Sequence, residues 1–288
     1  MMGIRLSVII VSYNSLEYLK ECISSIRSFN DIGESLEIIV VDNSTEKSTM
    51  DWLREQPGIV AISNENKGFG QGNNIGARVA KGEFLLFLNP DTVLIEPVFA
   101  HAIELFEKDS TLGLFGVQLV GKNRKRNSTY GLRMTMGLAR TLLSKMLVTF
   151  RVFLPRKMYT SGADIFIRKN VFENAGCFDE EFFMYCEEAD LCNRVNALGY
   201  KNGFVRNCKI IHLEGKTTEA KLFTSTIRLI ESRKHYCEKY GYDFIKFLNK
   251  EKRYCRIKSF FFSKKGDQKR ADEYYRIVEY MNQITAQG

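Results

Sequence analysis

The chain lacks the features that would place it across a membrane or in an oxidising compartment. No apolar run approaches the roughly 18–20 residues that a membrane-spanning helix requires. The chain begins with neither a charged segment nor a small-residue cleavage site, so we do not expect export. The seven cysteines form no C-x-x-C pair, which disfavours both a disulfide framework and a zinc site. We therefore expect reduced cysteines in a cytoplasmic protein.

The composition is that of a folded protein. Of 288 residues, 44% are hydrophobic and 26% are charged, which excludes wholesale disorder, a collagen-like repeat and a coiled coil. This length allows one large α/β domain or two smaller ones.

Residues 110–163 contain no acidic residue at all, and this absence accounts for the positive net charge of the chain. The stretch holds ten basic residues, so subtracting ten from the net charge of +8 leaves about −2 for the rest of the chain. Its second half sets apolar residues at helical spacing from Leu138 to Leu154, interrupted by Arg140, Lys145 and Arg151. This pattern fits either a helix packed on the core or one lying on an anionic membrane, and the missing acids favour the membrane. A second basic stretch covers residues 246–270, but no nucleic-acid-binding motif accompanies it, so we expect no nucleic-acid partner.

Strand-like and helix-like segments alternate along the first 95 residues. Hydrophobic runs that begin near residues 5, 36 and 83 are separated by helical patterns at about 15–29, 47–55 and up to residue 80. This alternation predicts an α/β fold with a mostly parallel, Rossmann-like sheet flanked by helices. Ligands of such sheets bind at the carboxyl ends of the strands. The polar residues at those ends are Asn14, Asp42, Asn43, Asn89 and Asp91.

The segment GFGQGNN resembles a dinucleotide-binding loop only in part. Its third position is Asn73 rather than glycine, and it lies outside the first strand–helix turn, so we exclude a nicotinamide enzyme.

Three features carry the candidate chemistry. Asn89-Pro90-Asp91 follows a buried strand, where a carboxylate either holds a divalent cation or caps a turn. Glu187, Glu188 and Asp190 open a predicted helix in a segment rich in acids. His212 ends a later strand, where it is either structural or a metal ligand.

Together these residues resemble a known family. SVIIVSYN, VVDNS, NENKGFGQGNN, FLNPD, SGADIFIRK, FDEEFFMYCEEADLCNR and the histidine-glycine segment up to Gly215 occur in that order. The series resembles family-2 inverting glycosyltransferases of the GT-A fold, and within them bacterial rhamnosyltransferases. The resemblance implies a GT-A domain over residues 1–215, divided into a nucleotide-binding half (1–95) and an acceptor half (96–215) with a basic amphipathic insert (122–158). Residues 216–288 are expected to form a helical, basic C-terminal extension.

The resemblance also implies roles for individual residues. Asp91 and His212 would bind a divalent metal, Mn²⁺ or Mg²⁺, and the imidazole favours Mn²⁺. Glu188 would be the catalytic base, with Glu187 as the alternative and Asp190 as the third acid of the motif. Asn89 stands where the family has an aspartate, and Glu188 also replaces an aspartate. The residues expected to bind the nucleotide-sugar are Tyr13, Asn14, Asp42, Asn66, Gly68, Phe69, Asn73, Asn74, Asn89 and Asp91.

The expected activity is transfer of a sugar from a dTDP- or UDP-sugar to a glycan or lipid-linked acceptor in bacterial surface polysaccharide synthesis. The protein would then work at the inner face of the cell membrane, in peripheral contact with anionic lipid. A sugar-phosphate nucleotidyltransferase is an alternative, although the segment YNSLEYLKE lacks the glycine-rich basic loop expected after its first strand. A non-catalytic membrane-binding module of the same fold is another alternative.

Overall fold

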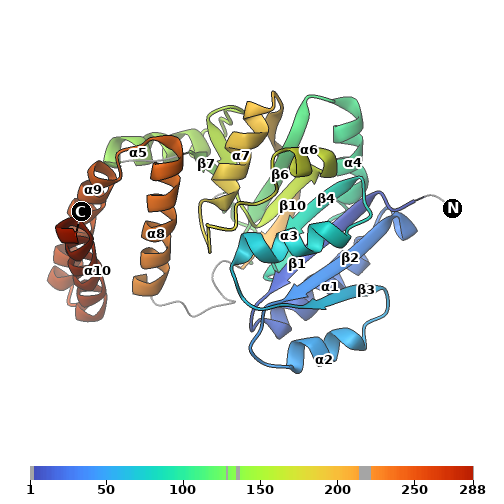
Figure 1. The fold of residues 1–288 in the computed structure, drawn as a ribbon, viewed down its shortest axis with the longest axis horizontal. Helices are drawn as coiled ribbons and strands as arrows, with labels where there is room; N and C mark the ends of the chain where they lie inside the picture. The colour runs from blue at the N-terminus through green and yellow to red at the C-terminus, as the bar shows by residue number, and fades with distance from the viewer. Residues whose placement is uncertain (1–2, 128, 134–136, 214–221, 288) are drawn as a thin grey trace.

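A mixed eight-stranded sheet forms the centre of the molecule (Figure 1). The computed structural model describes residues 3–127, 129–133, 137–213 and 222–287. The strands follow the order β3-β2-β1-β4-β9-β6-β10-β5. Their bounds are β1 Leu6–Ser12, β2 Leu36–Asp42, β3 Ile59–Ser63, β4 Phe84–Leu88, β5 Thr92–Leu94, β6 Leu112–Val120, β9 Asp164–Arg168 and β10 Lys201–His212.

The pairing of the strands confirms a mostly parallel sheet and adds two antiparallel strands. β3, β2, β1 and β4 pair in parallel, as do β6 and β10, whereas β9 runs antiparallel between β4 and β6. β5 pairs antiparallel with the end of β10. β1 and β4 are buried along their whole length, which explains their unbroken hydrophobic sequences.

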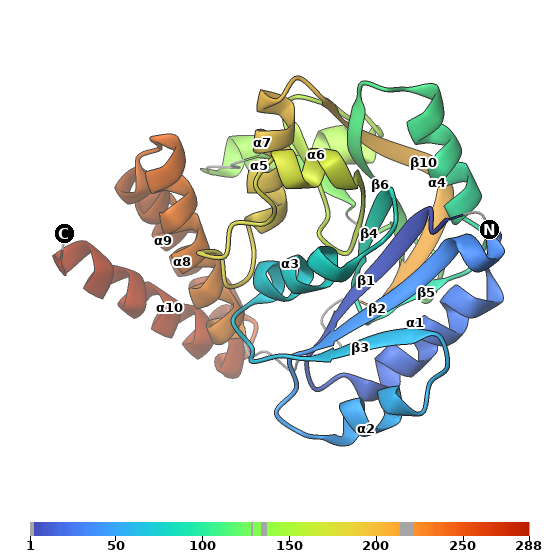
Figure 2. The same cartoon turned by 45° about the vertical axis from the view of Figure 1, so that its right-hand side comes forward.

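Helices cover both faces of the sheet (Figure 2). Alternate residues of the strands point to opposite faces, so Val8 and Ile10 pack on one helical layer and Ile9 on the other. The first layer consists of α1 Leu16–Ser28, α2 Ser48–Arg54 and α4 Phe99–Lys108. The second consists of α3 Phe69–Val79, α6 Lys169–Asn174 and α7 Glu187–Ala197. A short 3-10 helix, η1 Gly33–Ser35, precedes β2.

The basic segment folds into a small hairpin and a helix. β7 Tyr130–Leu132 pairs with β8 Met158–Thr160, and α5 Gly137–Thr149 connects them. Leu147 and Val148 of α5 pack against the hairpin, whereas Phe150, just after the helix, is 72% exposed. The apolar residues predicted to form a helix therefore divide between the core and the surface. The side chains of residues 134–141 lie outside those described.

Three helices complete the chain, α8 Leu222–Tyr240, α9 Phe244–Lys264 and α10 Gln268–Gln287. They share an apolar cluster that includes Leu248, Ile277 and Met281. α8 also packs on α7, because Tyr236 and Cys237 share a cluster with Ala189 and with Phe182 in the preceding loop. The predicted boundary at residues 215/216 lies outside the described residues. No helix in the described ranges is long and apolar enough to cross a bilayer.

Candidate active site

The carboxyl ends of the parallel strands meet at one edge of the sheet. β1, β2, β4, β6 and β10 point in the same direction, given the two antiparallel steps through β9. Asp42, the Asn89–Asp91 turn and His212 therefore lie along this edge. The predicted convergence of polar strand ends is present in the fold.

Asp91 and His212 form a close pair at this edge. Asp91 Oδ1 lies 3.3 Å from His212 Nε2, and Asp91 is only 3% exposed. Backbone pairing fixes the two residues, since Thr92 pairs with His212 and the Leu213 N–H donates to the Asp91 carbonyl at 3.0 Å. An acid oxygen and an imidazole nitrogen this close suit a divalent cation.

No group of three or more potential metal-ligating side chains occurs within the described ranges. Gly215, the last residue of the histidine-glycine motif, lies outside the described residues.

The predicted nucleotide-binding residues at β1 and β2 are joined by hydrogen bonds. The Asn14 backbone N–H donates to Ser44 Oγ at 2.8 Å, and Asn14 Oδ1 accepts from the Thr45 N–H at 3.2 Å. Ser44 Oγ in turn donates to Asp42 Oδ1 at 2.5 Å. Burial raises the pKa of Asp42, while the hydrogen bonds from Ser44 oppose that rise. Tyr13, beside Asn14, is 36% exposed and accessible to a flat ligand such as a nucleobase.

The GFGQGNN segment holds the loop that precedes α7. The Phe69 N–H donates to the Phe183 carbonyl at 2.9 Å, and a Cβ at Gly68 would lie 2.5 Å from that same oxygen. Gly68 has φ +112°, so both its conformation and this close approach require glycine. Asn66 Oδ1 accepts from the Gly68 N–H at 3.3 Å.

The two asparagines of this segment face different surroundings. Asn74 is bonded to the Phe178 backbone twice, through its Oδ1 and its Nδ2, each at 2.9 Å. The Asn74 side chain therefore anchors the loop between α6 and α7. Asn73 donates to the Phe69 carbonyl at 3.0 Å, and its buried Oδ1 has no partner among the described residues.

The acidic motif sits at the start of α7, after a strained turn. Tyr185 and Cys186 both have left-handed backbones, with φ +75° and +70°. Such strain is unfavourable for residues other than glycine and is concentrated at functional sites. These two left-handed residues turn the chain into α7, whose first residues are Glu187 and Glu188.

Glu187 and Glu188 differ in what they face. Glu188 lines a cavity of about 220 Å³, whereas Glu187 is buried, with 5% of its surface exposed. The Oε2 atom of each is buried and has no hydrogen-bond partner among the described residues. Burial raises the pKa of Glu188 to about 7, and burial together with the Glu188 charge raises the pKa of Glu187 well above its usual value.

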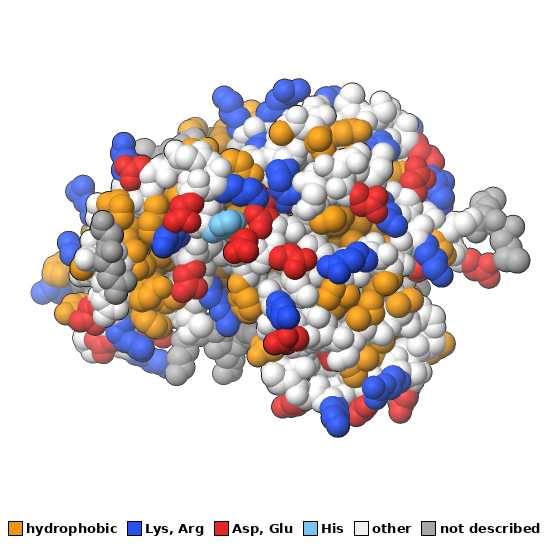
Figure 3. Space-filling view, viewed as in Figure 1, with side chains coloured by type: hydrophobic (Ala, Val, Ile, Leu, Met, Phe, Trp, Pro, Cys, Tyr) orange, Lys and Arg blue, Asp and Glu red, His pale blue; other side chains and the backbone are white. Residues whose placement is uncertain are grey.

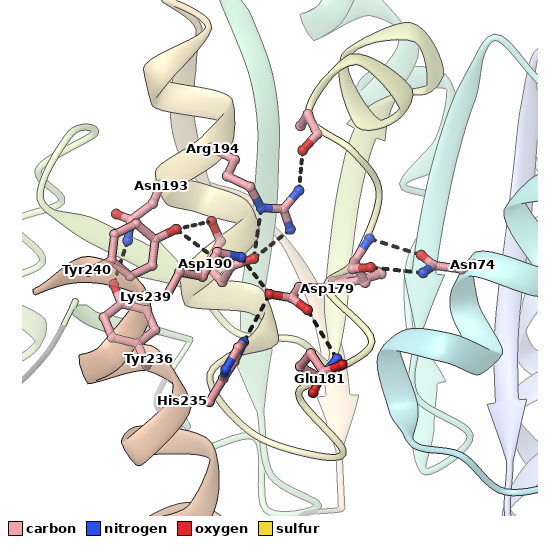
Figure 4. Close-up of polar contacts among 12 residues, drawn as sticks. Asn74, Asp179, Glu181, Asp190, Asn193, Arg194, His235, Tyr236, Lys239 and Tyr240 are labelled. Carbon is pink, nitrogen blue, oxygen red and sulfur yellow. Dashed lines mark hydrogen bonds and ion pairs between the residues drawn. The ribbon is translucent and has the colours of Figure 1, made fainter. Parts of the chain in front are cut away.

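Asp190 belongs to a network of ion pairs instead of the cavity lining (Figure 4). Its Oδ2 contacts Arg194 at 2.6 Å, and its Oδ1 accepts from Lys239 at 2.7 Å and from the Tyr240 hydroxyl at 2.7 Å. Lys239 also binds Asp179 at 2.6 Å, and His235 contacts the same carboxylate. The third acid of the motif thus joins α7 to α8.

The SGAD turn between β8 and β9 brings these parts together. A Cβ at Gly162 would lie 3.8 Å from Glu188 Cβ and 3.9 Å from the Phe69 ring. The Ala163 carbonyl accepts from the Asn89 N–H at 3.0 Å. The predicted base, the GFG segment and the Asn89–Asp91 turn therefore meet around one turn of four residues.

Two contributors to the site were missed from the sequence. Asp164 is fully buried at the same edge of the sheet and accepts from the Val117 N–H at 2.5 Å; burial raises its pKa well above normal. Its position within SGAD was the only signal in the sequence. The other contributor is α8, whose Leu229, Arg233 and Tyr236 line the Glu188 cavity, and no motif marks it.

Comparison with known proteins assigns this arrangement to a family. Residues 7–176 match the family model described as "Glycosyl transferase family 2", which covers more than half of the chain. The chain belongs to glycosyl transferase family 2 and is a glycosyltransferase. The sheet with its flanking helices has the GT-A fold, and the C-terminal helices are present.

Named relatives are consistent with this assignment. The chain is 28% identical to the rhamnosyltransferase WbbL of Escherichia coli over 224 residues, which cover 71% of this chain and 82% of WbbL. Among solved structures, residues 1–349 of S. aureus TarS superpose with a TM-score of 0.55 at 15% identity, covering 97% of this chain and 91% of that one. The mannosyltransferase PcManGT of Pyrobaculum calidifontis, solved with GDP-Man and Mn²⁺, gives a TM-score of 0.59 at 16% identity, covering 83% and 65%.

Proposed function

We propose that this glycosyltransferase is metal-dependent and inverting, and that it transfers a sugar from a dTDP- or UDP-sugar to a hydroxyl of a glycan or lipid-linked acceptor. One observation carries the proposal: the Glu188 carboxylate, whose buried Oε2 has no hydrogen-bond partner among the described residues, and a close acid–imidazole pair, Asp91 with His212, lie at the same edge of the sheet. The SGAD turn connects these two groups, because Gly162 lies beside Glu188 and the Ala163 carbonyl accepts from the Asn89 N–H.

Asp91 and His212 would hold the cation. When bound, a divalent cation neutralises the charge that develops on the leaving diphosphate. Asn14 and Asp42 would bind the nucleoside at the ends of β1 and β2, and Tyr13 would contact its base. Asn89, whose backbone is fixed by Ala163 and Thr92, would face the ribose or the sugar. The Mn²⁺ bound to PcManGT supports this assignment by analogy of fold.

Glu188 would act as the general base. As the acceptor oxygen attacks C1 of the sugar, the Glu188 carboxylate takes the proton of that hydroxyl, and the leaving diphosphate departs from the opposite face. A single displacement of this kind inverts the anomeric centre and needs one base. Glu188 faces a cavity and Glu187 does not, which favours Glu188 for this role.

The surface supports work on a membrane-bound acceptor. Exposed apolar residues gather on α9 and just after α5, among them Phe150, Ile257 and Phe260. Lysines lie over neighbouring rings, with Lys265 Nζ 4.4 Å from the centre of the Phe261 ring. Figure 3 shows hydrophobic surface over the C-terminal helices at the left, with Lys and Arg and some acidic side chains at its margins. This combination fits the anionic inner face of a cell membrane. Rhamnose is the sugar suggested by the name of WbbL.

Calorimetric titration with UDP, dTDP and GDP, with and without Mn²⁺, tests the donor site. We expect one nucleotide to bind in a Mn²⁺-dependent manner, and Asp91→Ala to remove that dependence. Asp51→Ala, which changes an exposed aspartate on α2, serves as the control and should bind as the wild type does. If none of the three nucleotides binds, the non-catalytic membrane module becomes the better interpretation. Release of free diphosphate from a nucleoside triphosphate and a sugar phosphate would instead identify a nucleotidyltransferase.

A further inference from the structure

A second cavity, of about 600 Å³, lies beside the β7–β8 hairpin. Gln118 and Thr129 form its buried polar floor, where the Gln118 amide donates to the Leu119 carbonyl at 2.8 Å and to Thr129 Oγ1 at 3.1 Å. Because these groups already bond to one another, the floor is fixed. A ligand would be recognised mainly by the groups around the rim.

The rim is strongly basic. Arg126, Lys145 and Arg151 line the cavity, and Arg206 of β10 donates to the Arg151 carbonyl. None of these four cations forms an ion pair with another described residue, and residues 111–162 contain no acid. The positive charges of Arg206, Arg151 and Arg126 oppose the rise that burial causes in the pKa of Tyr130, so all three lie near its hydroxyl.

Arg151 occupies a position where glycine would be the easier residue. The Arg151 N–H donates to the Val148 carbonyl and the Val152 N–H to the Leu147 carbonyl, which is the pattern of a Schellman helix end. Arg151 is the left-handed residue of that motif, with φ +60°. An arginine at this position costs backbone energy that glycine would not. The Arg151 side chain lines the cavity, and a role there would explain why an arginine occupies this position.

The cavity adjoins both halves of the proposed reaction centre. Leu132 and Tyr159 line it and also line the Glu188 cavity. Asn127, on its rim, donates to the His212 carbonyl at 3.1 Å. The expected nucleotide site lies at β1 and β2, and three strand spacings, about 14 Å in all, separate β1 from β6, where Gln118 lies. The cavity therefore lies on the acceptor side.

We propose that this cavity binds a phosphate group of an anionic acceptor, with Arg126, Lys145 and Arg151 as its ligands, while the acceptor hydroxyl reaches Glu188. The inference rests on the proposed function, because it assigns the acceptor of that reaction to a chemical class. Guanidinium groups bind phosphate oxygens in pairs and with charge-assisted hydrogen bonds. The phosphate belongs either to a lipid diphosphate carrier or to a soluble sugar phosphate.

Calorimetry in EDTA with inorganic diphosphate and farnesyl diphosphate tests this site without the metal. We expect Arg126→Gln and Arg151→Gly each to weaken binding about 10- to 100-fold, as loss of a charge-assisted hydrogen bond does. Arg151→Gly should leave the free energy of unfolding undiminished, since glycine suits the left-handed position. Arg156→Gln, which changes an exposed arginine that does not line the cavity, should bind as the wild type does.

The outcomes separate the sources and the proposals. Tighter binding of farnesyl diphosphate than of inorganic diphosphate identifies a lipid-linked acceptor, and equal binding identifies a soluble one. The inference is overturned if neither diphosphate binds at millimolar concentration. It is also overturned if Arg156→Gln weakens diphosphate binding as much as the cavity variants do. Equal weakening of Mn²⁺-dependent nucleotide binding by Arg151→Gly also overturns it, because the cavity would then serve the donor. Binding of diphosphate by a protein that binds no nucleotide overturns the proposed function and leaves the phosphate site standing.

Discussion

At the scale of single residues, Glu188 and Glu187 offer a matched test of the base. Both are glutamates at the start of α7 whose Oε2 has no hydrogen-bond partner within the described part of the chain, but only Glu188 lines the cavity. We expect Glu188→Gln to lower the rate of transfer by about 10²- to 10⁴-fold, the usual contribution of a general base, with unchanged nucleotide affinity. Glu187→Gln should have a smaller effect. Initial rates with saturating donor measure both, and the assignment fails if Glu187→Gln causes the larger loss.

The pH dependence of transfer follows from the same carboxyl. Burial raises the pKa of Glu188 to about 7, and a base must be deprotonated, so the rate should rise with pH up to about 7 and level off above it. The stability changes in the opposite direction: the contribution of the neutral carboxyl is present below pH 4.5 and is lost as the pH rises through 7. The surrounding ionisable groups are Tyr159 of β8, Tyr185, Cys186 and Glu187 at the turn into α7, and Arg233 and Tyr236 of α8. A flat profile of kcat between pH 5 and 8 would contradict a Glu188 base.

At the scale of elements, α8 is held to α7 by ion pairs as well as by packing. Asp190 is fully buried and bonds to Lys239, Tyr240 and Arg194. Burial alone would raise the pKa of Asp179, but hydrogen bonds from Lys239 and His235 outweigh it and hold that pKa at about 2. The stabilisation from Asp179 is therefore present above pH 3.8 and is lost as the pH falls through 2.

Removing Lys239 tests this attachment. We expect Lys239→Met to lower the free energy of unfolding by about 1–3 kcal/mol, because Asp190 stays buried with one donor fewer. The control is Lys234→Met on the same helix. Lys234 is exposed and its ion pair with Glu238 is long, at 4.0 Å, so this change should alter the free energy of unfolding little. Urea unfolding measures both. Equal effects of the two changes would show that the ion pairs do not hold α8.

At the scale of the whole molecule, the proposed membrane contact would depend on apolar residues from α9 and from the segment just after α5. Replacing Phe150, Ile257 and Phe260 together by serine should weaken binding to phosphatidylglycerol vesicles by more than about 10-fold. Burial of each of these side chains in the membrane would contribute up to about 1.5–3 kcal/mol to the binding free energy, and serine would lose that contribution. The control, Val60→Ser with Val79→Ser, changes two exposed apolar residues on β3 and α3, which are 43% and 45% accessible, and should bind normally. A flotation assay compares them. If the wild type does not float, or if the control loses as much, the proposed membrane face is wrong.

The sequence by itself determined the first strands of the sheet, the helices between them and the family. Buried parallel strands require unbroken hydrophobic runs, so β1, β2 and β4 could be predicted from their residues alone, as could the polar residues that follow them. The acidic motif and His212 could be identified in the same way, because motif residues occupy fixed positions along the chain.

Only the tertiary structure decided which of these residues face a cavity and which hold the fold. Glu188 and Asp190 lie two positions apart, yet one lines a cavity and the other bonds to α8. The antiparallel β9 and the cluster of Arg126, Arg151 and Arg206 are likewise set by contacts between distant segments. Periodicity and turn chemistry act between neighbours in the chain, whereas the direction in which a polar side chain points depends on the groups that packing brings against it.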